Sequence, residues 1–440
     1  MEADKPRRSK GRWYIMFLIC LMYLITYLDR VNISTVAPVI SKEFGFDKVT
    51  MGLIFSAFVW SYAAFQVPGG WLGDRFGPRN VLTILVGYWS VMTALTAAVT
   101  GAFSFVVIRF LFGIGEAGAF PSATRAMQEW YPRQERGLCQ GLSHSASRIG
   151  AAIAPPIVVA IMTTLGWHWV FYICGALGLL WTALWYLTYR NQPDEHPLVN
   201  RAELEYIRGV DAKGNIRAAS SERPKVPWRT LLRSPNMWAI MCAYFTYVYC
   251  LWIFLSWLPS YLVEYRHFTL LKVGILASLP LWAGVVGDTV GGLAVDRLLR
   301  KTGNTKLAHR AVAITGLLGC AVCIVPAAMT ESAYTAVACL TGAMFFLECT
   351  IGPSWAVPMH VGGKYSGTVS GMMNMAGNIG GALSPLVFGI LVQIGSWVAP
   401  FIVAAALLVC GAAVWAFWLD PEKSVLDTPT GSAVGAAAAE

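Results

Sequence analysis

Four of the ionisable side chains inside the long apolar stretches of this 440-residue chain could do chemistry there. They are the adjacent pair Asp29 and Arg30, and the pair Arg109 and Glu116, which are seven residues apart. A charge at membrane depth costs at least about 2.5 to 3.5 kcal/mol, so an uncompensated one is not expected to persist without a use. An arginine can bind a carboxylate through paired hydrogen bonds, and a buried carboxyl group can take up and release a proton. These residue types predict anion binding coupled to proton movement.

The spacing of the two pairs predicts different geometries. Seven residues are almost two helical turns, so Arg109 and Glu116 share one helix face and can share a cavity. Asp29 and Arg30 point about 100° apart, so each is expected to have another partner. An ionised Glu116 would compete for the arginine that a substrate carboxylate needs, whereas a protonated Glu116 would leave it free, and the same logic applies to Asp29. Buried ion pairs that only hold helices together are the alternative.

The elements that must position these residues are transmembrane helices. The chain is 56% hydrophobic and only 13% charged, against about 25% charged residues in soluble domains. Twelve apolar stretches are each long enough to cross a hydrocarbon core of about 30 Å. This composition excludes a soluble multidomain protein and predicts an all-α membrane protein. The predicted spans are 13–38, 50–73, 80–100, 103–130, 137–164, 168–189, 236–264, 272–295, 309–329, 332–360, 366–393 and 397–419.

The only long loop, residues 190–235, separates six spans from six. We therefore expect an amino-terminal half at 1–189, a linker at 190–235 and a carboxyl-terminal half at 236–440. If the amino terminus is cytoplasmic, 25 of the 33 Lys and Arg residues lie inside, four outside and four within spans. This bias predicts that both termini are cytoplasmic. It also accounts for the net charge of +9 without nucleic-acid binding.

An internal repeat relates the two halves. The pattern Gly-x-x-x-Asp-Arg occurs after the second span and again, 222 residues later, after the eighth. The segment 141–155 also aligns with the segment 371–385, and six of the fifteen aligned residues are identical. Two duplicated six-helix halves predict a substrate site at their interface, near the bilayer midplane.

The segment 69–80, GGWLGDRFGPRN, resembles the signature loop of the major facilitator superfamily. An acidic side chain there can accept charge-assisted hydrogen bonds from neighbouring cations and from helix N–H groups, and glycines let backbones approach closely. We expect a cytoplasmic gate that latches the two halves in one state; an ordinary solvated loop is the alternative. The gate residues are Gly70, Asp74, Arg75, Gly77, Arg79, Asp296 and Arg297.

Three further segments resemble the anion:cation symporter family, which includes bacterial sugar-acid permeases and the animal sialin and vesicular glutamate transporters. They are TYLDRVNIS at 26–34, RFLFGIGEAGAFP at 109–121 and SWLPSYL at 256–262. The resemblance implies that Asp29 and Glu116 are proton sites, that Arg30 and Arg109 are anion sites, and that Tyr27 and Tyr62 donate hydrogen bonds to the substrate.

One position departs from that family. Sugar-acid permeases tend to carry an amide in the fifth span where this chain has Arg148, which leaves the substrate open. Arg148 lies close to mid-membrane, and its repeat counterpart Asn378 is neutral. We expect it to contact a second anionic or strongly polar group of the substrate; pairing with Glu348 or with backbone carbonyls is the alternative. The other candidate substrate contacts are His144, Trp355, Asn374 and Asn378, and each of these could instead serve packing or an interior hydrogen bond.

Together these features predict a proton-coupled symporter that imports a small organic anion, a sugar acid or related carboxylate, by alternating access. We expect no enzymatic activity, no cofactor, no metal site and no ATP hydrolysis, since the chain has no phosphate-binding loop. The expected setting is a monomer in a lipid bilayer, the bacterial inner membrane. Two alternatives stay open: a drug:proton antiporter of the same fold, and a membrane receptor with a transporter-like fold.

Overall fold

A computed structural model describes residues 8–132, 135–209 and 228–426 of the chain. The described part is built from helices and contains no strand. Twelve of its helices or helix pairs are long and apolar enough to cross a membrane. The predicted all-α class and the twelve predicted spans are confirmed, with ends that shift by a few residues.

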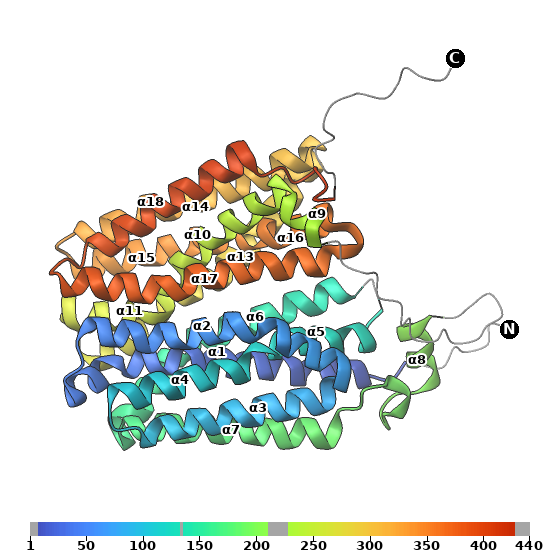
Figure 1. Ribbon diagram of the computed structural model, residues 1–440, viewed down its shortest axis with the longest axis horizontal. Helices are drawn as coiled ribbons and strands as arrows, with labels where there is room; N and C mark the ends of the chain where they lie inside the picture. The colour runs from blue at the N-terminus through green and yellow to red at the C-terminus, as the bar shows by residue number, and fades with distance from the viewer. Residues whose placement is uncertain (1–7, 133–134, 210–227, 427–440) are drawn as a thin grey trace, which may run out of the picture.

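The helices form two layers, one from each half of the chain (Figure 1). The amino half contains α1 (Gly11–Phe44), α2 (Lys48–Phe76), α3 (Pro78–Leu95), α4 (Ala102–Ala117), α5 (Ala119–Trp130), α6 (Arg136–Leu165) and α7 (Trp167–Thr188). The connection carries α8 (Arg201–Arg208) and α9 (Trp228–Arg233). The carboxyl half contains α10 (Pro235–Ser256), α11 (Leu258–Ser260), α12 (Leu270–Leu276), α13 (Ser278–Thr302), α14 (Thr305–Met329), α15 (Ala333–Glu348), α16 (Ile351–Gly362), α17 (Ser366–Gln393) and α18 (Ala399–Ala413).

Four predicted spans are interrupted helices rather than continuous ones. Each interruption lies just before a proline, which has no N–H to donate to the carbonyl four residues earlier. The prolines are Pro121, Pro259, Pro280 and Pro353. Pro385 lies within α17, which continues past it, so proline permits a break without imposing one. Two of the interruptions follow buried acids, since Glu116 and Glu348 lie at the ends of α4 and α15.

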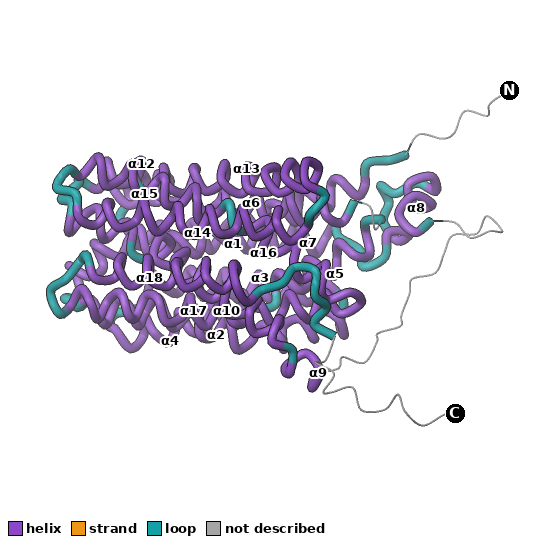
Figure 2. The backbone as a smooth tube through the Cα atoms, turned by 90° about the horizontal axis from the view of Figure 1, so that it is seen from above, coloured by secondary structure: helices purple, strands orange, loops and turns teal. Residues whose placement is uncertain are grey.

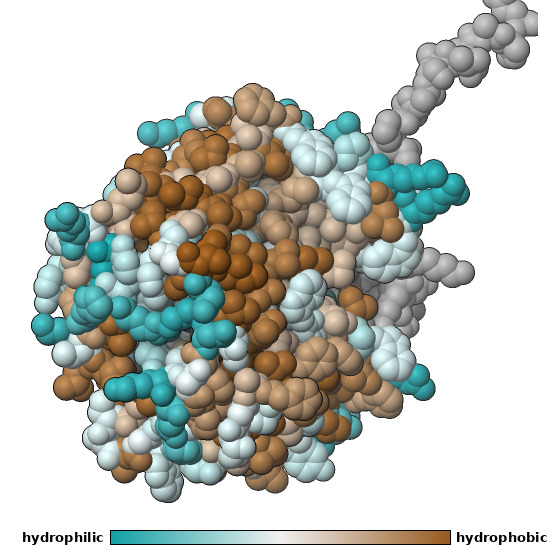
Figure 3. Space-filling view, turned by 60° about the vertical axis from the view of Figure 1, so that its left-hand side comes forward, coloured by the Kyte–Doolittle hydropathy of each residue, from teal (hydrophilic) through white to brown (hydrophobic). Residues whose placement is uncertain are grey.

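The outer surface of the bundle is apolar, as a bilayer requires. Large side chains are exposed on several helices, including Leu180 of α7 and Val322 of α14, which are 68% and 72% exposed. Figure 3 shows apolar residues over much of one face, with hydrophilic residues in limited groups. Burying such surface in lipid rather than water is favourable, so these side chains are the lipid-facing surface of the bundle.

We call the end of the bundle at which α8 and α9 lie the linker side (Figures 1 and 2). The two halves are in close contact toward the opposite side. Ser56 of α2 donates a hydrogen bond to the Ala382 carbonyl of α17 at 2.7 Å, and Lys48 forms an ion pair with Glu264. On the linker side, a Cβ added to Gly141 of α6 or to Gly371 of α17 would meet no other atom within 4 Å.

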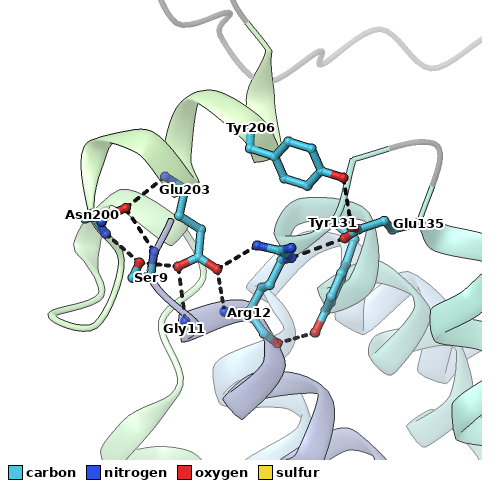
Figure 4. Close-up of polar contacts among 8 residues, drawn as sticks. All are labelled: Ser9, Gly11, Arg12, Tyr131, Glu135, Asn200, Glu203 and Tyr206. Atoms are coloured by element: carbon cyan, nitrogen blue, oxygen red, sulfur yellow. Dashed lines mark hydrogen bonds and ion pairs between the residues drawn. The ribbon is translucent and has the colours of Figure 1, made fainter. Parts of the chain in front are cut away.

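The amino terminus of α1 is clamped to the linker helix α8 (Figure 4). The fully buried Glu203 accepts hydrogen bonds from the backbone N–H groups of Gly11 and Arg12, and it pairs with the Arg12 guanidinium at 3.1 Å. Glu135, at the start of α6, holds the same guanidinium at 3.2 Å. Tyr206 of α8 donates to Glu135 at 2.8 Å. This cluster fixes the first part of the linker on the amino half.

Glu203→Ala is expected to release α8. Removing one partner of a buried ion pair costs about 3 to 5 kcal/mol, which corresponds to a rise of about 100-fold or more in the undocked population. Trypsin cleavage after Arg201 or Arg208 should accelerate accordingly. Glu205→Ala is the matched control, because Glu205 pairs with Arg201 on the exposed face of the same helix and such pairs contribute little. Equal cleavage rates in the two variants would contradict the clamp.

Candidate functional site

Arg30 and Glu116 form a buried ion pair between α1 and α4. Both Nε and Nη2 of Arg30 approach the same oxygen of Glu116, and the Glu116 side chain is completely buried. Glu116 lies in the last turn of α4, directly before the interruption at Gly118. A Cβ added to Gly118 would lie 2.9 Å from the Cα atom of Gly69 in α2, so glycine lets these helices cross closely. The sequence had placed Glu116 with Arg109, and the structure gives it Arg30 as its direct partner.

Aromatic rings surround the Arg30 guanidinium. Its central carbon lies 4.8 Å from the ring centres of both Tyr27 and Tyr62. Phe58 and Phe120 lie slightly farther away, at 5.5 and 5.4 Å. Ring faces attract a cation, and the apolar ring edges exclude water. Within this cage of rings, the charged partner of Arg30 is the Glu116 carboxylate.

Asp29 and Arg109 are also buried in the amino half. Both carboxylate oxygens of Asp29 and the Nε of Arg109 are buried without a hydrogen bond. The Arg109 guanidinium packs against the rings of Phe58 and Phe112 at 5.0 and 4.6 Å. The charges that act on Asp29 are those of Glu116 and Arg109. The amino half therefore holds two acids and two arginines in one electrostatic cluster.

A second buried cluster joins the two halves. Arg148 of α6 pairs with Glu348 of α15 at 2.9 Å and donates to the Tyr247 hydroxyl of α10 at 3.2 Å. Tyr247 in turn donates to Glu348 at 3.0 Å. Pairing with Glu348 is the alternative that the sequence left open for Arg148. The Arg148 guanidinium carbon also lies 5.9 Å from the centre of the Tyr27 ring, so Arg30 and Arg148 share this ring as a neighbour.

The remaining candidates line the same region from both halves. His144 of α6 lies 5.6 Å, ring centre to ring centre, from Trp355 of α16. The Trp355 indole donates to the Tyr244 hydroxyl at 3.1 Å. Asn378 donates its amide hydrogen to the Asn374 carbonyl one turn earlier in α17. The sequence analysis did not identify the interior residues Tyr244 and Tyr247 as site residues. Two tyrosines three residues apart in an apolar helix give no indication of which side chains they contact.

Most of the predicted gate residues lie at the linker-side ends of α2, α3 and α13. Gly77 has φ = +80°, which favours glycine and turns the chain from α2 into α3. The Arg79 guanidinium donates to the Tyr186 carbonyl at 2.9 and 3.1 Å, and Arg75 lies over the ring of Trp71. The side chain of Asp74 lies outside the described residues.

The other predicted gate residues belong to the two copies of the repeated Gly-x-x-x-Asp-Arg motif. A Cβ added to Gly70 would lie 3.2 Å from Pro121 of α5, so α2 and α5 approach closely there. In the second copy, Asp296 and Arg297 are exposed near the end of α13. Exposed charges of both signs at this end can form contacts with the opposite half without first leaving a buried site.

The chain matches the sequence model of the Major Facilitator Superfamily over residues 19–385 and 357–439. It is 44% identical to a probable sulfoacetate transporter of Cupriavidus necator, over 96% of this chain and 97% of the relative. It is 31% identical to a D-galactonate transporter of Escherichia coli O6:H1, over 97% of this chain and 99% of the relative. A probable galactarate/D-glucarate transporter of Escherichia coli K12 is 33% identical over 89% of each chain.

The fold also matches solved structures. A bacterial homologue of the human lysosomal transporter Spinster, in an inward-facing and unoccupied conformation, superposes with a TM-score of 0.73 at 18% identity. The match covers 94% of this chain and 97% of that one, and at this identity it establishes the fold alone. Together with the twelve spans, the family match and the curated relatives show that the chain belongs to the Major Facilitator Superfamily, as a multi-pass membrane transporter and not an enzyme.

Proposed function

We propose that this protein is a proton-coupled symporter that imports a small organic anion by alternating access. The observation that carries the proposal is the buried Arg30–Glu116 pair in its aromatic cage. Buried charges at membrane depth are functional by default, and this pair has the two parts that coupling needs. The arginine can hold a substrate carboxylate, and the glutamate can hold a proton in its place.

The coupling step is an exchange of partners at Arg30. Ionised Glu116 occupies the guanidinium and excludes the substrate. Once Glu116 is protonated, Arg30 is free to bind the substrate carboxylate, so substrate and proton are taken up together. We propose Asp29 as the second proton site, since its carboxylate lacks a hydrogen-bond partner. Arg109 interacts electrostatically with both acids, and together with Arg30 it balances their charge when both are ionised.

Arg148 supports a substrate with two anionic groups. Its guanidinium group and that of Arg30 both lie near the Tyr27 ring, so we propose that a compact acid reaches both. Sulfoacetate, which the name of one relative gives as its substrate, has a carboxylate and a sulfonate on one carbon and is our first candidate; sugar acids are the second. The other residues proposed to contact the substrate are Tyr27, Tyr62, His144, Trp355, Asn374 and Asn378.

We propose that the linker side is cytoplasmic, because most of the cations outside the spans belong to it. The contacts at Lys48 and Ser56 would then close the outer side. A bacterial inner membrane, with both termini in the cytoplasm, is the setting that fits the named bacterial relatives. Import would end with release toward the linker side, where Gly141 and Gly371 face open space.

Uptake into proteoliposomes tests the proposal. Labelled sulfoacetate and labelled galactonate should accumulate when the outside is acidic, and a protonophore should abolish accumulation. A drug:proton antiporter would instead expel a cationic compound under the same gradient. A receptor would bind an anion without moving it. Either result would replace the proposed function.

The gate residues should affect turnover more than binding. Asp74→Asn and Asp296→Asn each remove a charge at the linker side, away from the cage around Arg30. We expect a fall in maximal uptake rate of about tenfold, the effect of losing one charge-assisted contact of about 1.5 kcal/mol. The substrate Kd should change by less than about twofold. A selective loss of affinity at normal turnover would contradict this assignment.

A further inference from the structure

Glu348 is the counterpart of Glu116 in the second half of the chain. The pattern Glu-x4-Pro-Ser occurs at Glu116–Ser122 and again, 232 residues later, at Glu348–Ser354. In both copies the glutamate lies at or next to the end of a helix, directly before an interruption that precedes the proline. The duplication therefore placed two equivalent acids on two broken helices, one in each half.

Both acids are fully buried and each is paired with one arginine. Arg30 belongs to the same half as Glu116, whereas Arg148 reaches Glu348 from the opposite half. The Glu348 side chain is tightly packed against its neighbours. A Cβ added to Gly284 of α13 would lie 3.1 Å from the Cγ atom of Glu348, and Tyr247 contacts both Arg148 and Glu348. A carboxylate is thus already held where a guanidinium and a hydroxyl converge.

We infer that Arg148 and Tyr247 form a second anion subsite, that Glu348 occupies it as an internal carboxylate, and that the second anionic group of the substrate displaces Glu348. This inference rests on the proposed function, because it concerns the same substrate. Its geometric basis is the Tyr27 ring, which lies 4.8 Å from the Arg30 guanidinium and 5.9 Å from that of Arg148. One small dianion can therefore engage both arginines, and a monoanion can engage only one.

Displacement of Glu348 from Arg148 also changes the charge balance at this site. The charged and titratable groups that face Glu348 are Arg148 on α6, Tyr244 and Tyr247 on α10, and Asp288 on α13, with Cys349 following it in sequence. Arg148 is the one cation in this described set. Once the substrate takes Arg148, the Glu348 carboxylate is buried beside a second acid without a cation, so it takes up a proton from solution. The second charge of the substrate is thereby matched by a second proton.

Binding to the purified full-length protein in detergent tests this inference without transport. Sulfoacetate serves as the dianion, and acetate and methanesulfonate serve as the two monoanions. Glu348→Gln removes the competing charge, so sulfoacetate should bind about tenfold or more tightly while the two monoanions are unchanged. Proton uptake on sulfoacetate binding, followed with a pH dye in weak buffer, should fall by one relative to the wild type.

Two further variants make the test specific. Asp288→Asn removes a nearby carboxylate that does not hold Arg148, and it should shift sulfoacetate affinity by less than about twofold with the proton count unchanged. The double variant Arg148→Gln, Glu348→Gln removes both charges. It replaces Glu348→Gln in the binding measurement if that single variant fails to fold. In it, the affinities for dianion and monoanions should converge, and the proton count should again fall by one.

The outcomes separate this inference from the proposed function. If Glu348→Gln binds sulfoacetate no more tightly than the wild type, or takes up the same number of protons on binding, then Glu348 only stabilises helix packing. The inference would then be wrong. An equal gain in Asp288→Asn would reduce the effect to general electrostatics and would also overturn it. If the wild type binds neither these three anions nor galactonate, the proposed function itself fails.

Discussion

Glu116→Gln is expected to abolish accumulation of substrate while leaving exchange intact. Glutamine has the shape of a protonated glutamate and cannot ionise, so Arg30 stays free for the substrate in both orientations of the transporter. A pH gradient can then no longer drive uptake of a monoanion such as galactonate, because the variant has lost the carboxyl group that releases Arg30 when it binds a proton. In proteoliposomes, labelled anion should equilibrate with preloaded unlabelled anion at a rate near that of the wild type. The accumulation ratio under an imposed pH gradient should fall to about one.

Glu205→Gln is the control for this result. Glu205 is another glutamate, but it lies on the linker helix α8 and pairs with Arg201 on the exposed surface. Accumulation by that variant should match the wild type. If Glu116→Gln still concentrates substrate against its gradient, Asp29 or Glu348 carries the coupling proton, and the Arg30–Glu116 pair is a fixed packing contact.

Arg30→Lys should nearly abolish both binding and uptake although the charge is kept. The guanidinium presents Nε and Nη2 together toward the Glu116 carboxylate and packs flat against ring faces, whereas an ammonium is a point charge with neither property. A charge-assisted hydrogen bond contributes about 1.5 to 3 kcal/mol. The loss of one corresponds to about a 10- to 100-fold weaker Kd.

Arg79→Lys is the matched substitution outside the cage. The Arg79 guanidinium donates to a backbone carbonyl on the linker side, so its replacement should leave the substrate Kd within about twofold of the wild type. Titration calorimetry on purified, folded protein measures both variants. A wild-type Kd in Arg30→Lys would remove Arg30 from the anion site and would favour Arg109 in its place.

The number of spans and the fold class were readable from the sequence because they depend on local properties. A stretch of twenty apolar residues crosses a bilayer whatever surrounds it, and a repeated motif marks a duplication wherever it folds. The ends of the spans were less exact. The predicted span 236–264 is interrupted after Ser256, and α1 continues to Phe44, where Gly45 in a left-handed conformation ends it.

The candidate chemical residues could be predicted from the amino-acid sequence alone. Asp29, Arg30, Arg109 and Glu116 were identifiable because a charge inside an apolar span is costly and therefore conspicuous. Spacing along one helix could say which side chains share a face. It could not say which side chains meet across helices.

The tertiary structure decided the pairing of these charges. Arg30 and Glu116 are 86 residues apart in sequence, and Tyr247 lies 99 residues from Arg148 and 101 from Glu348. Such partners are chosen by how helices pack, by the close crossing at Gly118 and by the breaks before Pro121 and Pro353. Helix periodicity contains none of this information, because it describes each helix alone. The proposed exchange of carboxylates at Arg30 depends on contacts between helices, and only the folded chain specifies these contacts.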